Sequence, residues 1–300
     1  MSSYRFCRTD DIGLLVDALN RCWAPYVPDE PLMTPAAFKR SIRDLQVWCS
    51  SCMVAFSGSD PIGVLIGAKR PSGTLVHTIA VHPDHLRQGH GRHLLTSLGS
   101  KLAILGPPRM IAELPETLAP ACELFSASGY VQEARLTDYV LERDENPSTR
   151  VEFPRSLRAG DDEGRFLIPI TVDDLAANGL LGEAGPQVCW ERSVETLTAR
   201  KDEIAGLAVA TDERIEAYVL YVTRGKEQAE IVSLRSFIDD GGDRLRQLLS
   251  QICARGMETF RLVKVHPAEI SKKWLETLGF TPAGGHLLYA ASARSPEAGR

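Results

Sequence analysis

The stretch Thr78-Ile-Ala-Val-His-Pro-Asp-His-Leu-Arg-Gln-Gly-His-Gly-Arg-His-Leu-Leu95 carries the clearest structural signal in the sequence. It begins as an apolar strand, passes through a turn with two glycines, and continues as a helix with apolar residues at helical spacing. Glycines let backbone N–H groups converge on one concavity, and a helix N-terminus adds partial positive charge. Arg87 and Arg92 flank that concavity, which favours an anion such as a pyrophosphate over a plain turn.

This run resembles motif A of the GNAT superfamily, the acyl-CoA-dependent N-acyltransferases. In that family an apolar strand, often ending Val-His-Pro, is followed by Arg/Gln-x-x-Gly-x-Gly/Ala and a helix. Here Val81-His-Pro-Asp84 precedes Leu86-Arg-Gln-Gly-His-Gly91. The first basic or amide position falls on Leu86, which predicts a weaker side-chain contact above an intact backbone cradle. The pattern is neither a Walker loop nor a Rossmann fingerprint, because the closing Gly-Lys-Ser/Thr and the third glycine are missing.

The resemblance implies acetyl-CoA as the acyl-donor co-substrate, with no metal. It also implies that the turn after the strand holds the diphosphate through backbone N–H groups and neighbouring side chains. The residues expected to do so are Arg87, Gln88, Gly89, His90, Gly91 and Arg92.

Length and charge set limits on the class of protein. At 300 residues the chain is long enough for two ordinary domains, each with its own core. A net charge of -5 argues against general nucleic-acid binding and against a polybasic membrane surface. The first residues lack the apolar segment of a signal peptide, and no apolar run is long enough to cross a bilayer. We therefore expect a cytoplasmic monomer or homodimer with no nucleic-acid or membrane partner.

The seven cysteines are scattered singly apart from Cys49-Ser-Ser-Cys52. That pair is compatible with a redox motif or with half of a zinc site. No second pair and no nearby His-x-x-x-His completes a metal site, so reduced structural thiols are expected. The odd number of cysteines also suits a reducing compartment.

The same order of elements occurs twice along the chain. Each half has a Thr-Asp-rich helix start, a hairpin, a third strand, an amphipathic helix and a Gly-aromatic turn. The corresponding segments are helix starts at Thr9 and Thr171, hairpins at 52–69 and 204–222, third strands at 75–81 and 231–238, helices at 92–105 and 243–254, and turns at Gly129 and Gly279. Closing strands are expected at 137–141 and 286–290.

This repeat predicts two domains, 1–147 and 166–300, joined by a polar linker at 148–165. The final helix and Gly-aromatic turn of each half resemble motif B of the GNAT fold, so the resemblance implies a tandem of two GNAT-like domains. The expected fold class is α/β (α+β). Each domain would be a mixed, mostly antiparallel twisted sheet with splayed central strands, flanked by helices.

The two halves differ at the turn before the amphipathic helix. Where the first half has Arg87-Gln-Gly-His-Gly-Arg92, the second has Asp239-Asp-Gly-Gly-Asp-Arg244. Three carboxylates would repel a pyrophosphate, and a helix N-terminus contributes only about 0.3–1 kcal/mol against them. We therefore expect the second domain to be degenerate and non-catalytic, serving in packing, dimer formation or one wall of the substrate cleft.

Acyl transfer is expected beside the strand 75–81. In the GNAT fold this strand binds pantetheine through its backbone, which implies contacts at Ile79, Ala80 and Val81. Strict alternation would place His77, Ile79 and Val81 on one face. A base that titrates near neutrality is needed, and we predict His77 for this role, with Glu113 as the alternative. A core histidine and a solvated carboxylate are the structural alternatives for these two residues.

The general acid is the main departure from the family. GNAT proteins often carry a tyrosine four residues before the motif B glycine, and here that position is Phe125. A thiol leaves readily as thiolate, so the loss is tolerable, and water or Ser126 would serve. Phe125 is expected to pack on the pantetheine.

Acceptor specificity in this fold comes largely from the loop after the first helix, here 22–33. Trp23 and Tyr26 are expected to line an acceptor pocket, with Asp29 or Glu30 holding a cationic amine. Aromatics that only pin the loop to the core are the alternative.

The leading hypothesis is an N-acetyltransferase that moves an acetyl group from acetyl-CoA to an amine of a small molecule or peptide, by direct attack in a ternary complex. The alternative is a non-catalytic acyl-CoA-binding sensor or assembly module. A nucleotide-binding module that is not a transferase is a third reading.

Overall fold

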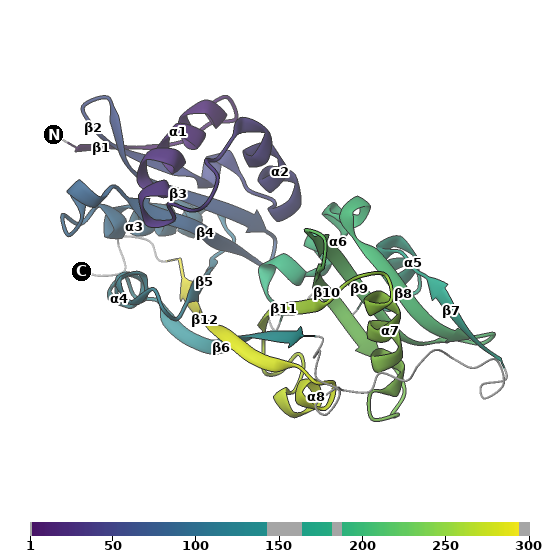
Figure 1. Ribbon diagram of the computed structural model, residues 1–300. Helices are drawn as coiled ribbons and strands as arrows, with labels where there is room; N and C mark the ends of the chain where they lie inside the picture. The colour runs from purple at the N-terminus through teal and green to yellow at the C-terminus, as the bar shows by residue number, and fades with distance from the viewer. Residues whose placement is uncertain (1, 143–163, 182–187, 294–300) are drawn as a thin grey trace. The chain divides into compact units, whose positions relative to one another are not determined.

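The computed structural model describes residues 2–142, 164–181 and 188–293 of the chain. The chain forms two compact units, one made of Met1–Ala134 with Leu287–Arg300 and the other of Arg135–His286 (Figure 1). Each unit contains a mixed sheet with helices packed on it, as the sequence predicts.

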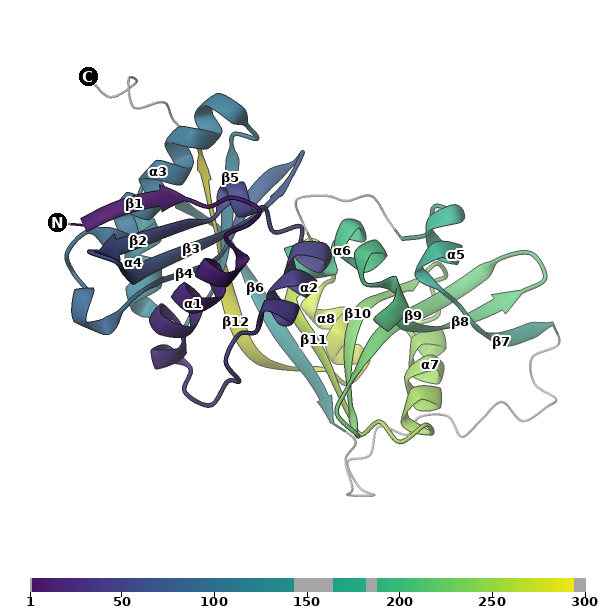
Figure 2. The same ribbon diagram turned by 90° about the horizontal axis from the view of Figure 1, so that it is seen from above.

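The first unit is built on a sheet with strand order β1-β2-β3-β4-β5-β12. Neighbouring strands from β1 to β4 are antiparallel, whereas β4 and β5 are parallel. Helices α1 and α2 cover one face of this sheet, and α3 and α4 cover the other (Figures 1 and 2). The elements are β1 (Ser2–Phe6), α1 (Ile12–Cys22), α2 (Pro35–Leu45), β2 (Met53–Ser57), β3 (Asp60–Arg70), β4 (Gly73–Val81), α3 (His90–Leu105), β5 (Arg109–Pro115), α4 (Ala119–Ala127), the start of β6 (Val131–Glu142) and the end of β12 (Thr281–Ser292).

The core of the first unit lies between its sheet and α3. Leu94, Leu98 and Leu102 lie on one face of the helix and are almost fully buried, as their spacing predicts. They belong to the same apolar cluster as Met110 and Leu114 of β5. Burying a leucine side chain contributes about 1.5–3 kcal/mol, so this packing holds the start of α3 in a fixed place beside the sheet.

The second unit repeats this plan with the strand order β6-β11-β10-β9-β8-β7. Here β10 and β11 are the parallel pair, while β10 and β9 are antiparallel. The elements are β7 (Arg165–Pro169), α5 (Val172–Ala177), α6 (Val194–Ala199), β8 (Ala205–Thr211), β9 (Ile215–Arg224), β10 (Gln228–Ser236), α7 (Asp243–Cys253), β11 (Thr259–Val265) and α8 (Lys272–Thr277).

Only one of the two predicted helix caps is formed. Thr171 caps α5 in a reciprocal capping box with Asp174. The predicted cap of α1 is wrong, because Asp11 makes no side-chain cap there. Its carboxylate instead accepts hydrogen bonds of 2.8 and 2.9 Å from the guanidinium of Arg5.

The closing strands of the two halves are exchanged between the units. Most of β6 belongs to the second unit, where Tyr139 pairs with Leu262 of β11 in antiparallel register. The last residues of β12 belong to the first unit, where Tyr289 is buried in the α3 core. The predicted linker at 148–165 lies almost entirely outside the described residues, so the sequence-based division stays a prediction.

Candidate functional site

The central strands of the first unit separate part of the way along. Among the described residues, the parallel pairing of β4 with β5 is confined to Thr74–Met110 and Leu75–Ile111. On its other side, β4 stays paired with β3 as far as the pair of Val81 and Gly63. The last part of β4 therefore has one edge that no neighbouring strand covers, and its backbone groups there are not paired with β5.

Alternation of the backbone identifies which groups face this opening. The N–H of His82 donates to the carbonyl of Ile62 on β3, at 2.9 Å. Backbone groups alternate in direction along a strand, so those of Ala80 also point to β3, whereas those of Ile79 and Val81 point to the open edge. Of the three predicted backbone contacts, Ile79 and Val81 are suitably placed and Ala80 is not. The carbonyl of Val81 accepts a hydrogen bond from the hydroxyl of Tyr26, at 2.6 Å.

The turn after β4 leads into an open helix N-terminus. Gly89 caps α3 with a φ of 86°, a conformation that favours glycine. A Cβ built on Gly89 would have no described atom within 4 Å, so the space beside it is open. The first N–H groups of a helix lack partners within that helix, and α3 therefore presents donors to an anion.

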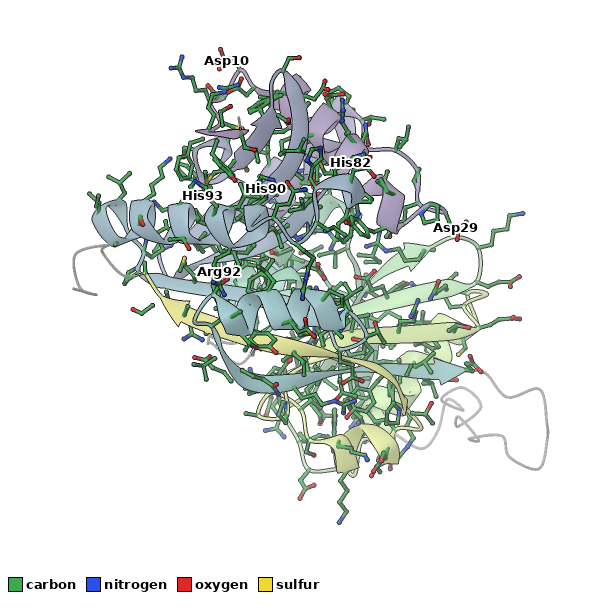
Figure 3. All side chains as sticks on the ribbon, turned by 90° about the vertical axis from the view of Figure 1, so that its left-hand side faces the viewer. Asp10, Asp29, His82, His90, Arg92 and His93 are labelled. Carbon is green, nitrogen blue, oxygen red and sulfur yellow. The ribbon has the colours of Figure 1, made fainter. Side chains whose placement is uncertain are left out.

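The residues around Gly89 divide into those that face solvent and those that hold α4. Arg87 is a surface cation whose guanidinium lies 3.8 Å from the carboxylate of Glu123, with 87% of its side chain exposed. Arg92 instead donates to the carbonyl of Ala127 at the end of α4, at 3.1 Å, and lies between the two helices (Figure 3). A Cβ on Gly91 would lie 2.9 Å from the side chain of Leu124, so this glycine permits the close approach of α4. Gly91 and the side chain of Arg92 were both predicted to hold the phosphate. The structure shows that both contact α4.

His90 is buried at the first position of α3. Its Nδ1 is 2.6 Å from the hydroxyl oxygen of Tyr4, and the residue is only 5% exposed. Burial, and then the nearby His85 and His93, lower the pKa of His90. Its imidazole is therefore a neutral structural group at neutral pH, and only its backbone is suited to the predicted anion contact. The side-chain amide of Gln88, also predicted for the phosphate, donates back to the carbonyl of Asp84, at 3.4 Å.

A bulge in β4 changes the face to which His77 points. Thr78 pairs with Ile66 and Val76 with Gly67, so His77 is an extra residue in the register. As a result His77 and Thr78 both line the same pocket, while Val76 and Ile79 pack toward the α3 side. The strict alternation that placed His77 and Ile79 on one face is wrong, because it assumed a regular strand.

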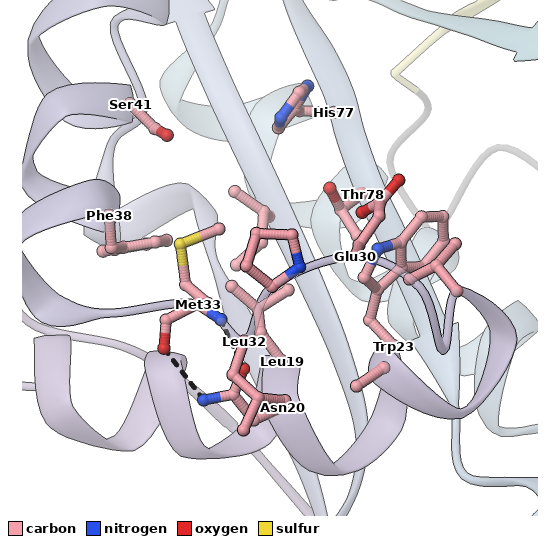
Figure 4. Close-up of a pocket in the computed structure, with 14 residues that line it drawn as sticks. Leu19, Asn20, Trp23, Glu30, Leu32, Met33, Phe38, Ser41, His77 and Thr78 are labelled. Atoms are coloured by element: carbon pink, nitrogen blue, oxygen red, sulfur yellow. Dashed lines mark hydrogen bonds between the residues drawn. The ribbon is translucent and has the colours of Figure 1, made fainter.

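The pocket lies on the α1 and α2 side of the sheet and has a volume of about 290 Å³ (Figure 4). Trp23 lines it, as predicted, whereas Tyr26 is not among its lining residues. The lining residues are Leu19, Asn20, Trp23, Ala24, Val27, Glu30, Pro31, Leu32, Met33, Phe38, Ser41, Ile66, His77 and Thr78. His77 is exposed on this wall.

Glu113, the alternative base, lies on β5 beyond the point where β4 and β5 part. Its neighbours Ala112 and Leu114 are buried in the α3 core, so Glu113 faces the opposite side of the sheet. It is only partly exposed and is not among the residues that line the pocket. Of the two predicted bases, His77 is the one that borders the pocket.

Phe125 is part of the core. Its side chain is fully buried, with its ring 4.9 Å from that of Tyr130 and 6.3 Å from that of Tyr289. The structure thus places this ring among core aromatics and offers no exposed surface for the predicted packing on pantetheine.

The corresponding helix start in the second unit is filled by the protein itself. The two carboxylate oxygens of Asp240 accept hydrogen bonds from the backbone N–H groups of Gly242 and Arg244, at 2.9 and 2.8 Å. A carboxylate thus takes the place that an anionic ligand would need at the N-terminus of α7. Arg246 donates to the carbonyl of Thr277 in α8, as Arg92 does to α4.

All seven cysteines are free thiols. Burial raises the pKa of Cys7 to about 12 and that of Cys22 to about 11, so both stay protonated at neutral pH. No group of three or more His, Cys, Asp or Glu residues in the described part of the chain is placed to hold a metal ion. None of the described helices is both long and apolar enough to span a bilayer.

Comparison with known proteins agrees with this architecture. The family model described as the Acetyltransferase (GNAT) family matches residues 15–130. No curated protein matches the sequence. A tandem GNAT protein from the clavulanic acid biosynthesis pathway is similar in structure, with 16% identity, a TM-score of 0.65, and coverage of 98% of this chain and 99% of that one.

Two bacterial proteins are similar to the same extent. A GCN5-related N-acetyltransferase from Sphaerobacter thermophilus has 14% identity and a TM-score of 0.66, covering 98% of this chain and 96% of its own. A GCN5-related N-acetyltransferase from Kribbella flavida has 12% identity and a TM-score of 0.64. The match covers 99% of this chain and 72% of that one. Residues 15–130 thus match the GNAT family, and the structural likeness extends the fold over both units.

Proposed function

We propose that the protein is an N-acetyltransferase that moves an acetyl group from acetyl-CoA to an amine held in the pocket beside His77. The first unit carries the reaction, and the second unit is a degenerate copy without an acyl-CoA site. The amine attacks the thioester directly while both substrates are bound.

The observation that supports this most strongly is the order of features along β4. The pocket residues His77 and Thr78 come first, the open-edge backbone of Ile79 and Val81 follows, and the uncovered helix start at Gly89 comes next. A donor with its diphosphate at Gly89 and its pantetheine along the open edge would bring its thioester to the pocket. Holding both reactants in this way converts a bimolecular reaction into an effectively intramolecular one.

The residues divide the chemistry between them. His77 takes the proton that the attacking ammonium must lose, directly or through a water, since an imidazole titrates near neutrality. The new C–N bond forms at the thioester carbonyl, the C–S bond breaks, and the electron pair leaves on sulfur. Backbone N–H groups at the open edge of β4 stabilise the oxygen that gains charge. Water or Ser126 protonates the thiolate, because Phe125 has no proton to give.

The family's use of acetyl-CoA fits the residues present. Donors from the first turn of α3, the exposed guanidinium of Arg87 and the space beside Gly89 suit a diphosphate. In the second unit the carboxylate of Asp240 fills the matching position, which supports a single acyl-CoA site in the chain.

A non-catalytic acyl-CoA sensor remains the second candidate, because the hydroxyl often used as acid in this family is absent at Phe125. Incubation with acetyl-CoA and a panel of amines, followed by detection of free CoA thiol and of acetylated amine, separates the two. Amine-dependent thiol release supports the transferase. Binding of acetyl-CoA at the first unit with no product from any amine would support the sensor, and crystals that hold the donor only near Gly241 would contradict both.

A further inference from the structure

Resting on the proposed acetyl transfer, we infer that the acceptor is a small monoamine with an apolar body and no carboxylate. The inference comes from the size of the pocket, from the polarity of its wall and from the placement of its charged group.

The volume of the pocket limits the acceptor. At about 290 Å³ it lies at the small end of the range for ligand sites. A pocket of this size suits a small molecule better than an extended chain. An oligosaccharide or a longer peptide would extend beyond the residues that line the pocket.

The wall is mainly apolar. Met33, Phe38 and Ile66 are among the side chains that form it, and Phe38 is 1% exposed. The side-chain amide of Asn20 donates to the carbonyl of Met33 and accepts from its N–H, at 2.9 and 2.7 Å, which holds the loop at Met33 against α1. This part of the wall therefore favours an apolar body over a hydroxylated one.

The negative charge of the pocket lies on one side of it. Among the described residues that line the pocket, Glu30 is the one carboxylate, and there is no lysine or arginine. Glu30 lies near Trp23 and Thr78, on the side away from Phe38 and Ser41 (Figure 4). A carboxylate and an indole face both favour a cation. An ammonium placed there adjoins Thr78, one residue from the open backbone of Ile79 where the acyl group is expected.

This arrangement discriminates against two common classes of amine. An α-amino acid would place its carboxylate in a pocket whose described lining has no lysine or arginine to pair with it and has Glu30 nearby. A polyamine of similar size would place further ammonium groups beside Phe38 and Met33, away from Glu30, which is the one carboxylate of the described lining. A monoamine such as 2-phenylethylamine satisfies both the acidic corner and the apolar wall.

The first experiment compares 2-phenylethylamine with phenylalanine and with spermidine. We expect kcat/KM for the monoamine to exceed both by about tenfold or more. Glu30→Gln should raise the KM for the monoamine about tenfold and leave the KM for acetyl-CoA unchanged. The matched control is Asp17→Asn, which neutralises an exposed carboxylate of α1 outside the pocket lining and should change neither constant.

Binding is also measured without turnover, by the change in fluorescence of Trp23, with Trp23→Phe as the blank. A monoamine that binds while no amine is acetylated would overturn the proposed function and leave the acceptor class standing. Turnover or binding of phenylalanine or spermidine at least as good as that of the monoamine would overturn the inference and leave the transferase standing. Equal effects of Glu30→Gln and Asp17→Asn on the KM for the monoamine would also overturn the inference.

Discussion

The hydroxyl of Tyr26 donates a 2.6 Å hydrogen bond to the carbonyl of Val81. That carbonyl points to the open edge of β4, where we expect the pantetheine arm of the donor. Tyr26 is 46% exposed, and burial raises the pKa of its hydroxyl, so it is a neutral donor at neutral pH. The free protein thus occupies, with its own side chain, a backbone acceptor that the proposed donor substrate would use.

Tyr26→Phe should therefore tighten the binding of acetyl-CoA. Removing the competing hydroxyl frees the Val81 carbonyl, and a net hydrogen bond of about 0.5–1.5 kcal/mol corresponds to a two- to tenfold lower Kd. Titration calorimetry at fixed salt measures it. Tyr4→Phe, which removes a hydroxyl bonded to His90, serves as control. An unchanged or raised Kd for Tyr26→Phe would mean that the pantetheine arm does not use this carbonyl.

Arg87→Ala and Arg92→Ala should have different effects. Arg87 is the exposed cation at the turn, so its loss should raise the KM for acetyl-CoA several-fold and reduce the dependence of binding on salt. Arg92 bonds the end of α4, so its loss should lower the free energy of unfolding by about 1 kcal/mol. Steady-state kinetics and thermal unfolding of both variants test the pair. Equal KM values for wild type and Arg87→Ala would remove Arg87 from the donor site.

His77→Ala should flatten the acidic limb of the pH–rate profile. A base acts only when deprotonated, so kcat/KM for the amine rises with pH through the titration of that base. Loss of the imidazole should lower the plateau by about a hundredfold or more and remove the rise. Glu113→Gln is the matched comparison and should retain the limb. The opposite pattern, with the limb lost only in Glu113→Gln, would assign the base to β5.

Asp240→Ala should destabilise the second unit without affecting catalysis. Its carboxylate accepts two backbone N–H groups at the start of α7, and loss of such a cap costs about 0.5–2 kcal/mol. Chemical denaturation measures the loss, and kinetics should give unchanged constants for acetyl-CoA. A change in the KM for acetyl-CoA would show that the second unit takes part in donor binding.

His90 should make stability depend on pH. Because burial lowers the pKa of His90 in the folded chain, the unfolded chain binds this proton more readily. The stability it contributes is complete above the unfolded pKa of about 6.5 and declines as the pH falls from there toward the folded pKa. His90→Gln should therefore lose less stability than wild type on acidification from about pH 7.5 to about pH 5.5. His266→Gln, in the second unit, should behave as wild type.

The repeated elements were predictable because their signals are local. The α3 stripe through Leu94 and Leu98 has helical spacing, and the hairpin strands β2 and β3 are bounded by a Gly-Ser-Asp turn. These patterns depend on the chain's own periodicity. The open helix start followed in the same way from Gly89 and the residues beside it.

Other features depend on contacts that sequence spacing does not encode. The bulge at His77 exists because Thr78 and Val76 pair with adjacent residues of β3. The role of Gly91 is set by Leu124, thirty-odd positions away, and Phe125 is buried between the nearby Tyr130 and the distant Tyr289. The exchange of β6 and β12 is also invisible locally, since either strand has the pattern to close either sheet.

The exchange of these two strands makes the halves of the chain interdependent. A fragment that ended between them would lack Tyr289 and the rest of the strand beside β5, and would leave β6 without β11. Each gene half therefore encodes an incomplete protein. The second half supplies a strand that the sheet of the first unit needs, while at the start of its own α7 the carboxylate of Asp240 accepts the backbone N–H groups of Gly242 and Arg244.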